Sequence, residues 1–230
     1  DASGAQPRDA REQPAVVGDL LDDPPPSTAQ RLMVAQWKRA VNANAEGDYS
    51  PFLGIRIIRG EFAITVDSDA MPTRPRPAGA PLFSCAGGPA PAMQRVRARQ
   101  TRLLVATSAD TTAKGFDGFD SCASDVTVVA RGGRLPKAEA RWVDFVIKVK
   151  PGPRGGGEIE IFADGAWIAS VSGRIGHEGP ELGQTQYFKF GPYRDGGQQD
   201  RWRVFYDGFR RGPECSDVAG AGLCDQLKPR

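Results

Sequence analysis

One run near the end of the chain holds residue types that can transfer a proton beside an acidic group. It reads Tyr187-Phe188-Lys189-Phe190-Gly191-Pro192-Tyr193-Arg194. A tyrosine hydroxyl can act as an acid, but its ordinary pKa of about 10 is too high for a base unless nearby cations lower it. Lys189 and Arg194 could do so if the chain turns back at Gly191-Pro192. We therefore expect Tyr193 to move a proton and Tyr187, Lys189 and Arg194 to contact the substrate.

Earlier parts of the chain hold side chains that can bind a carboxylate. Gln36 can donate amide N–H bonds, and Arg56 can grip a carboxylate with its guanidinium fork. Lys38 adds a cation two positions after Gln36. The single histidine, His177, precedes the tyrosine run in a Gly- and Pro-rich loop, so it is either a solvated bystander or a catalytic residue at the rim of the site.

These residues need a scaffold, and the sequence predicts one made of strands. Short apolar runs separated by turn residues give roughly ten strand candidates and no convincing amphipathic helix. The candidates are residues 31–38, 52–59, 61–67, 102–108, 126–131, 141–150, 157–164, 166–172, 185–191 and 201–209. Gly60 and Asp164-Gly165 mark two hairpins. This pattern predicts an all-β antiparallel sandwich of the jelly-roll type.

Alternation along a strand separates the side chains of its two faces. In 185–193 it places Gln186, Phe188 and Phe190 on one face, and Tyr187, Lys189 and, if the strand continues, Tyr193 on the other. In 31–38 it separates Leu32, Val34, Gln36 and Lys38 from Met33, Ala35 and Trp37. Arg56 falls on the face opposite Ile55 and Ile57. Polar and aromatic side chains from several strands would then share one open sheet face.

Composition narrows the class of protein. The 230 residues include 28 Gly and 19 Pro, a content that excludes a coiled coil or a helical bundle. No apolar run is long enough to span a bilayer, and a net charge of +2 gives no broad surface for nucleic acid. One histidine excludes a metal centre built from several histidines. We expect an arm at residues 1–30, one domain at 31–230, and a monomer.

The four cysteines indicate in which cellular compartment the protein resides. They are Cys85, Cys122, Cys215 and Cys224, and their spacing fits neither a redox motif nor a zinc ribbon. Gly-, Ser- and Pro-rich surroundings favour disulfides, Cys215–Cys224 with Cys85–Cys122, and a secreted or periplasmic protein. Four free thiols in a cytosolic protein remain the alternative.

The order of these motifs resembles the jelly-roll polysaccharide lyases. Gln36-Trp37-Lys38, then Trp142-Val143-Asp144-Phe145, the 187–194 run and Val204-Phe205-Tyr206-Asp207 follow one another as in that superfamily, over roughly residues 30–211. The run itself is similar to the Tyr-Phe-Lys-x-Gly-x-Tyr pattern of alginate lyases. The strands before and after it are closest to glucuronan lyases and the heparin lyase I type.

The resemblance implies β-elimination in a uronate-containing polysaccharide, glucuronan being the foremost candidate, with the proton-transfer role on Tyr193. It implies no required cofactor, although loop carboxylates could hold a structural calcium. Where the alginate lyase pattern has a histidine after Gln-x, this chain has Lys38, and the Arg-x-Glu-Leu strand of related lyases is only loosely matched by Arg8–Glu12. A non-catalytic glycan-binding module on the same fold is the alternative.

Overall fold

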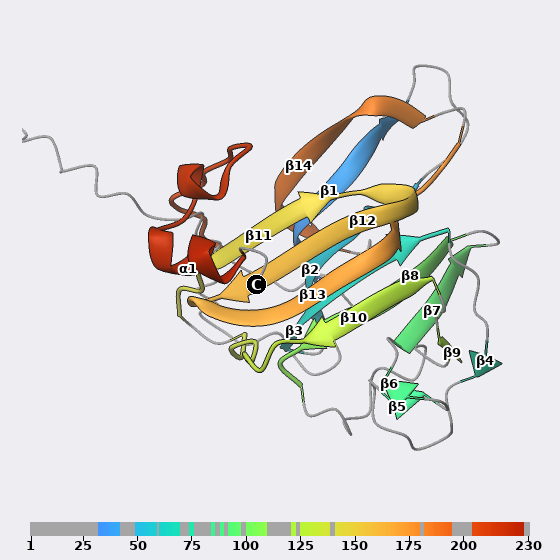
Figure 1. The fold of residues 1–230 in the computed structure, drawn as a ribbon, viewed down its shortest axis with the longest axis horizontal. Coiled ribbons are helices and arrows are strands. Elements are labelled where there is room, and N and C mark those ends of the chain that lie inside the picture. Colours follow the sequence, from blue (N-terminus) through green and yellow to red (C-terminus); the bar gives the residue numbers. More distant parts are fainter. Residues whose placement is uncertain are drawn as a thin grey trace, which may run out of the picture.

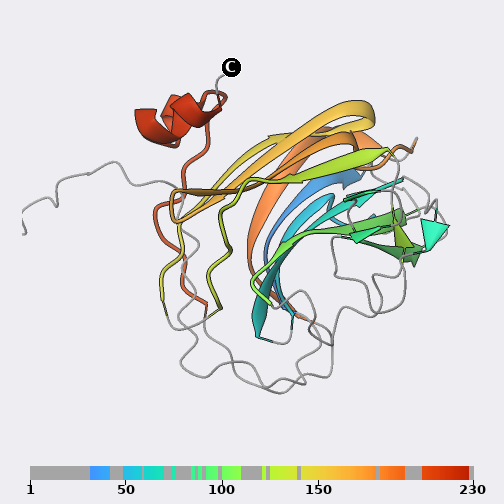
Figure 2. The ribbon, with the colours of Figure 1, turned by 60° about the horizontal axis from the view of Figure 1, so that its bottom comes forward.

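The fold is an antiparallel β-sandwich, as the sequence predicts. A computed structural model describes residues 32–41, 49–58, 60–69, 74–75, 84–85, 88–89, 92–97, 100–109, 121–122, 125–138, 141–179, 182–194 and 204–227. Two sheets are stacked face to face, and both are curved (Figures 1 and 2). The proposed arm at 1–30 lies outside the described residues.

The larger sheet has eight strands in the order β14-β1-β2-β3-β8-β7-β9-β4. Their bounds are β14 Leu182–Arg194, β1 Leu32–Val41, β2 Leu53–Ile58, β3 Glu61–Ser68, β8 Gln100–Thr107, β7 Ala92–Arg97, β9 Ser121–Cys122 and β4 Arg74–Pro75. Strand β14, which carries the tyrosine run, forms one edge of this sheet and pairs with β1.

The smaller sheet has four strands in the order β10-β13-β12-β11. They are β10 Val126–Ala130, β13 Ala166–Ile175, β12 Gly152–Ala163 and β11 Phe145–Lys150, and a short pair β5 Ser84–Cys85 and β6 Gly88–Pro89 stands apart. A 3-10 helix η1 Cys215–Asp217 and helix α1 Ala221–Gln226, which the sequence did not predict, project beyond the sheets at the C-terminal end (Figure 2).

Both predicted hairpins are confirmed. Gly60, between β2 and β3, has a φ of 81°. Asp164 and Gly165, between β12 and β13, have φ values of 49° and 75°. Two consecutive left-handed residues form the tight turn whose twist matches the flanking strands, and Asp-Gly is a favoured pair for it.

The core lies between the two sheets and consists of the alternate side chains that face inward. From the large sheet it takes Ile55, Ile57, Phe62 and Ile64, and from the small sheet Ile159, Ile161, Ala169 and Val171, all of them buried. The rings of Phe62 and Phe145 meet edge to face across the sheets, with centroids 5.6 Å apart. The other face of the large sheet is thereby left for polar side chains.

Two local predictions are wrong. The described residues 204–209 of the expected strand 201–209 form no strand beyond a single bridge at Asp207. This segment is held by side chains instead: the Tyr206 hydroxyl donates to the Val34 carbonyl at 2.9 Å, and the Phe209 ring stacks on Phe188. The expected turn at Gly191-Pro192 is also absent, because β14 runs on to Arg194 through an irregularity in its pairing with β1.

The disulfide between Cys215 and Cys224 is confirmed, with a Cα–Cα distance of 5.7 Å. It joins η1 to α1, and the hydrogen bond from the Cys224 amide to the Gly220 carbonyl lies within the same loop. The side chains of Cys85 and Cys122 lie outside the described part, so their pairing stays a prediction.

Candidate functional site

The register of β14 and β1 places four predicted residues on one face of the large sheet. Lys189 lies opposite Gln36, and Tyr187 lies opposite Lys38. Directly opposed residues of antiparallel strands point to the same side of the sheet. The Lys189 ammonium lies 5.1 Å from the centre of the Tyr187 ring, as expected for neighbours on one face.

Tyr193 and Arg56 join this face through Met33, which pairs with both of them. Neighbouring strands lie about 4.8 Å apart, and residues two apart on a strand lie roughly 7 Å apart. Tyr193 is therefore two strands from Arg56 and one row of side chains from Lys189. These residues and Gln36 form a patch on the order of 10 Å across.

The predicted faces of β1 are right for Ala35, Gln36 and Trp37 but wrong for Leu32 and Met33. The pairing of β1 with β2 shifts between Met33 and Ala35, because Met33 pairs with Arg56 and Ala35 with the adjacent Ile55. One extra residue in a strand reverses the direction of the side chains beyond it. Met33 thus lies on the same face as Gln36.

The patch is open over β14 and closed over β2. The Tyr193 side chain is 58% exposed and Lys189 is exposed, whereas Gln36, Lys38 and Tyr187 are half-buried. Arg56 is 1% exposed, and its Nε donates to Thr65 Oγ1 at 2.8 Å. Arg56 is therefore a buried cation on the same sheet face rather than an exposed fork.

A glycine makes room for this buried arginine. Gly54 lies opposite Gln36 on one side and opposite Thr65 on the other. A Cβ atom built on Gly54 would lie 3.3 Å from Arg56 Nε and 3.4 Å from the Met33 methyl carbon. The guanidinium thus occupies the space that a side chain at position 54 would fill, next to Gln36.

Arg194 ends β14, where its backbone pairs with Leu32. Its side chain lies outside the described part, so its expected contact with the substrate stays a prediction.

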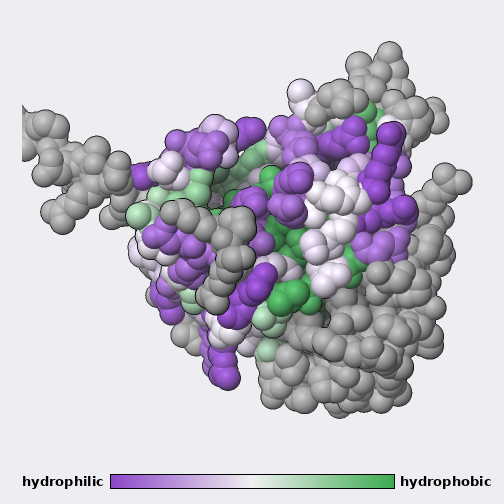
Figure 3. Space-filling model, viewed as in Figure 1, coloured by the Kyte–Doolittle hydropathy of each residue, from purple (hydrophilic) through white to green (hydrophobic). Residues whose placement is uncertain are grey.

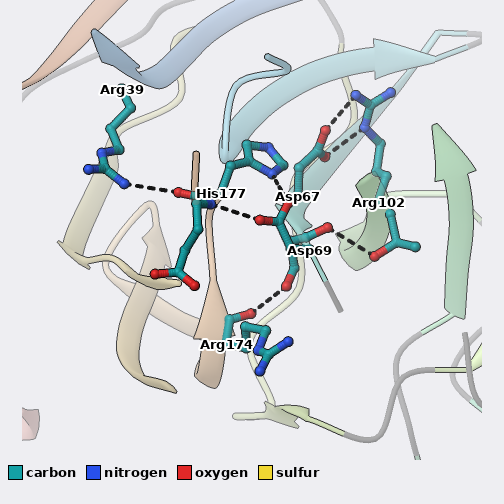
Figure 4. Close-up of polar contacts among 9 residues, drawn as sticks. Arg39, Asp67, Asp69, Arg102, Arg174 and His177 are labelled. Carbon is teal, nitrogen blue, oxygen red and sulfur yellow. Dashed lines mark hydrogen bonds and ion pairs between the residues drawn. The ribbon is translucent and has the colours of Figure 1, made fainter. Parts of the chain in front are cut away.

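His177 does not join the patch. It lies at the other end of β14, where Arg39 Nη1 donates to the His177 carbonyl at 2.9 Å and Arg39 Nε donates to the Gly183 carbonyl at 2.9 Å. The imidazole is 4% exposed, and its Nδ1 lies 2.8 Å from Asp69 Oδ1 (Figure 4). Of the two readings of His177, neither a solvated bystander nor a residue beside Tyr193 fits this position.

Asp67 and Arg102 form an ion pair on the same sheet face that the sequence did not predict. Asp67 of β3 lies opposite Arg102 of β8, and the two form hydrogen bonds of 2.8 Å and 2.7 Å (Figure 4). Burial acts to lower the pKa of Arg102, but the charge of Asp67 and the hydrogen bond to it outweigh burial, and the pKa is raised. The sequence shows an acid near the end of β3 but gives no indication of its partner.

A cavity of about 520 Å³ lies on the opposite side of β14 from the patch. Its lining includes Trp37, Phe188, Phe190, Tyr206 and Phe209. Phe209 stacks on Phe188 with ring centroids 5.1 Å apart. Hydrophobic side chains are visible between the C-terminal segment and the sheet, while hydrophilic ones dominate the outer face of the small sheet (Figure 3). Tyr187 and the charged residues Lys148, Arg210, Arg211 and Glu214 also line the cavity, so the lining combines aromatic and charged side chains.

Within the described ranges, no group of three or more His, Cys, Asp or Glu side chains could hold a metal ion. The structural calcium stays a prediction. No helix in the same part of the chain is long and apolar enough to cross a membrane.

Comparison with models of protein families gives a match. The family model described as Polysaccharide lyase matches residues 20–210. This range takes in β1, β2 and β14, and so every strand that contributes to the patch. Neither the curated proteins nor the solved structures compared with the chain include a match.

Proposed function

Because this chain belongs to the polysaccharide lyase family, we propose that it cleaves a uronate-containing polysaccharide by β-elimination and that Tyr193 moves the proton. The observation that carries the proposal is the placement of Tyr193, Lys189 and Gln36 on one open sheet face. The family acts on polysaccharides, and the acidic polymer, glucuronan first, is our more specific expectation.

The elimination requires three catalytic functions from the protein: neutralisation of the carboxylate, a base and an acid. The carboxylate next to C5 must be neutralised, because the C5 proton is otherwise too weakly acidic. A base then takes that proton, the electron pair of the C5–H bond forms the C4–C5 double bond, and the C4–O4 bond breaks. An acid returns a proton to O4, so the products are an unsaturated uronate end and a new hydroxyl end.

Tyr193 can supply both proton transfers. As a phenolate it takes the C5 proton, and as the resulting phenol it gives that proton to O4, which restores the starting state. Its 58% exposure leaves the hydroxyl open to a bound chain. Lys189 lies one row of side chains away on the same strand and face, where its positive charge faces the bound acidic polymer.

The other residues of the patch are assigned to the substrate carboxylate. Gln36 donates amide N–H bonds from β1, and Lys38 adds a cation one row further along. Tyr187 and Arg194 extend the contact along β14. Arg56 packs beside Gln36. Its buried guanidinium occupies the space over Gly54, the residue opposite Gln36.

The family and the Cys215–Cys224 disulfide fit an extracellular enzyme. We propose that the protein is secreted or periplasmic and acts as a monomer that requires no cofactor.

The test is a panel of polymers followed by the ultraviolet absorbance of the unsaturated end. Glucuronan, alginate, heparin and hyaluronan should include at least one substrate, and Tyr193→Phe should lower kcat on it by at least about 10³-fold, the upper range for acid–base catalysis. Phe190→Tyr is a matched control, because Phe190 is an exposed aromatic on the opposite face of the same strand. No absorbance with any uronate polymer would overturn the proposal.

The alternative of a non-catalytic glycan-binding module is favoured by one observation, Lys38 in the position where the alginate lyase pattern has a histidine. Binding of a polyuronate by the intact chain without any unsaturated product would decide for it.

A further inference from the structure

The carboxylate of Asp69 makes two hydrogen bonds to the segment that leads from β13 into β14. Asp69, one residue beyond β3, accepts from the His177 ring at 2.8 Å with Oδ1 and from the Glu178 amide at 2.7 Å with Oδ2. The same segment meets β3 through a parallel bridge between Ser68 and Gly176. The two carboxylate oxygens of Asp69 thus bind two successive residues that lie shortly before β14 (Figure 4).

A second tie comes from β1. Arg39 donates to the His177 carbonyl with Nη1 and to the Gly183 carbonyl with Nε, both at 2.9 Å. The Arg39 guanidinium therefore links His177, which Asp69 binds, to Gly183 near the start of β14. Because Arg39 is paired with Gln186 in the sheet, this tie also bears on the register of β14 against β1.

The histidine is placed to hold position rather than to meet substrate. Asp69 accepts a hydrogen bond, so Nδ1 carries the proton. The other ring nitrogen, Nε2, is buried and makes no hydrogen bond with any described residue. The Tyr49 ring lies beside the imidazole, with centroids 5.9 Å apart. The imidazole is thus enclosed, with Nδ1 bonded to Asp69 and Nε2 away from solvent.

Strand β14 needs such a tie, because it is the edge strand of its sheet and carries Tyr187, Lys189 and Tyr193. An edge strand has a neighbouring strand on one side only, so its position depends on that ladder and on its ends. We propose that Asp69 and His177 form a positioning pair that fixes the start of β14 and so sets the catalytic face of that strand. The role rests on the lyase function proposed above.

Three substitutions in the full chain separate the alternatives. His177→Ala and Asp69→Ala remove the contact, whereas His177→Asn retains an N–H that can donate to Asp69. Glu178→Gln is the matched control, because the Glu178 side chain contacts exposed Arg154 and both bonds of Asp69 remain in place. Each variant is compared by kcat and KM on the polymer that the wild type cleaves, and by hydrogen exchange of residues 182–187.

For a positioning pair we expect kcat to fall roughly 10- to 100-fold in both alanine variants, because a displacement of about 1 Å can cost 10²-fold. His177→Asn should restore kcat to within about fivefold of wild type, and the pH profile should keep its shape. Exchange at 182–187 should speed up in the alanine variants, return to normal in His177→Asn and stay unchanged in Glu178→Gln.

Other results overturn the inference. Equal loss in His177→Asn and His177→Ala, together with a lost limb of the pH profile, would make His177 an acid or base. Unchanged kcat and unchanged exchange in the alanine variants would leave the pair without a role in β14. If the wild type cleaves no polymer, the lyase function fails, and hydrogen exchange still decides whether the pair fixes the strand.

Discussion

Loss of the Asp67 charge should destabilise the protein strongly, because Asp67 and Arg102 form a buried ion pair. The two side chains are 0% and 9% exposed and are joined by two hydrogen bonds. Asp67→Asn keeps the shape of the side chain but leaves the guanidinium charge without its counter-ion. Removing one partner of a buried pair costs about 3–5 kcal/mol, and for a chain of this length each kcal/mol lowers Tm by roughly 2–4 °C. We therefore expect Tm to fall by about 10 °C.

The assay is thermal and urea unfolding of wild type, Asp67→Asn, and the double variant Asp67→Leu with Arg102→Met. Because the double variant removes both charges, it should be more stable than Asp67→Asn alone. The exposed pair Lys148–Glu158, at 3.2 Å, is the control, and its loss should cost less than about 1 kcal/mol. A loss below about 1 kcal/mol in Asp67→Asn, or a double variant less stable than the single one, would refute the reasoning.

Three further predictions concern pH and packing. Burial raises the pKa of Asp144, so Asp144→Asn should raise Tm at neutral pH, and the gain should vanish as pH falls below the ordinary value of 3.8. Lys148 lowers the pKa of Glu158, so Glu158→Gln should lower Tm slightly at neutral pH, with no effect once the carboxyl is protonated in strong acid; equal signs for the two variants would contradict this. Gly54→Ala should push Arg56 aside and cost about 1–3 kcal/mol in urea unfolding, with raised KM on the cleaved polymer; unchanged stability would show that the guanidinium yields freely.

The sequence predicted the parts of the fold that depend on local pattern. Alternation in 185–193 and the Asp164-Gly165 pair each specify a structure within a few residues, and both predictions are confirmed. Contacts between distant positions had no such signal. Asp69 and His177 are 108 residues apart, and they meet where the parallel bridge between Ser68 and Gly176 joins their segments.

Burial was the other property that residue types alone could not reveal. An arginine between apolar neighbours can be an exposed fork or a buried cation, and alternation only gives its face. Arg56 is buried because Gly54 leaves space for the guanidinium and Thr65 accepts its Nε bond. Both partners lie in the row of side chains next to that of Arg56, so the pattern of β2 alone could not show the result.

The number of extra residues that each strand inserts, odd or even, explains the two outcomes. Alternation gives the correct face for Tyr193 and the wrong face for Met33. Between their pairs with Arg56 and Ile55, which are adjacent in β2, strand β1 advances from Met33 to Ala35 and so holds one extra residue. Strand β14 advances three positions over the same stretch, from Phe190 to Tyr193, and so holds two extra residues. An odd insertion reverses the side-chain direction, and an even one preserves it. Gly191-Pro192 therefore keeps Tyr193 on the face of Lys189 within a continuous strand, although its residue types favour a turn.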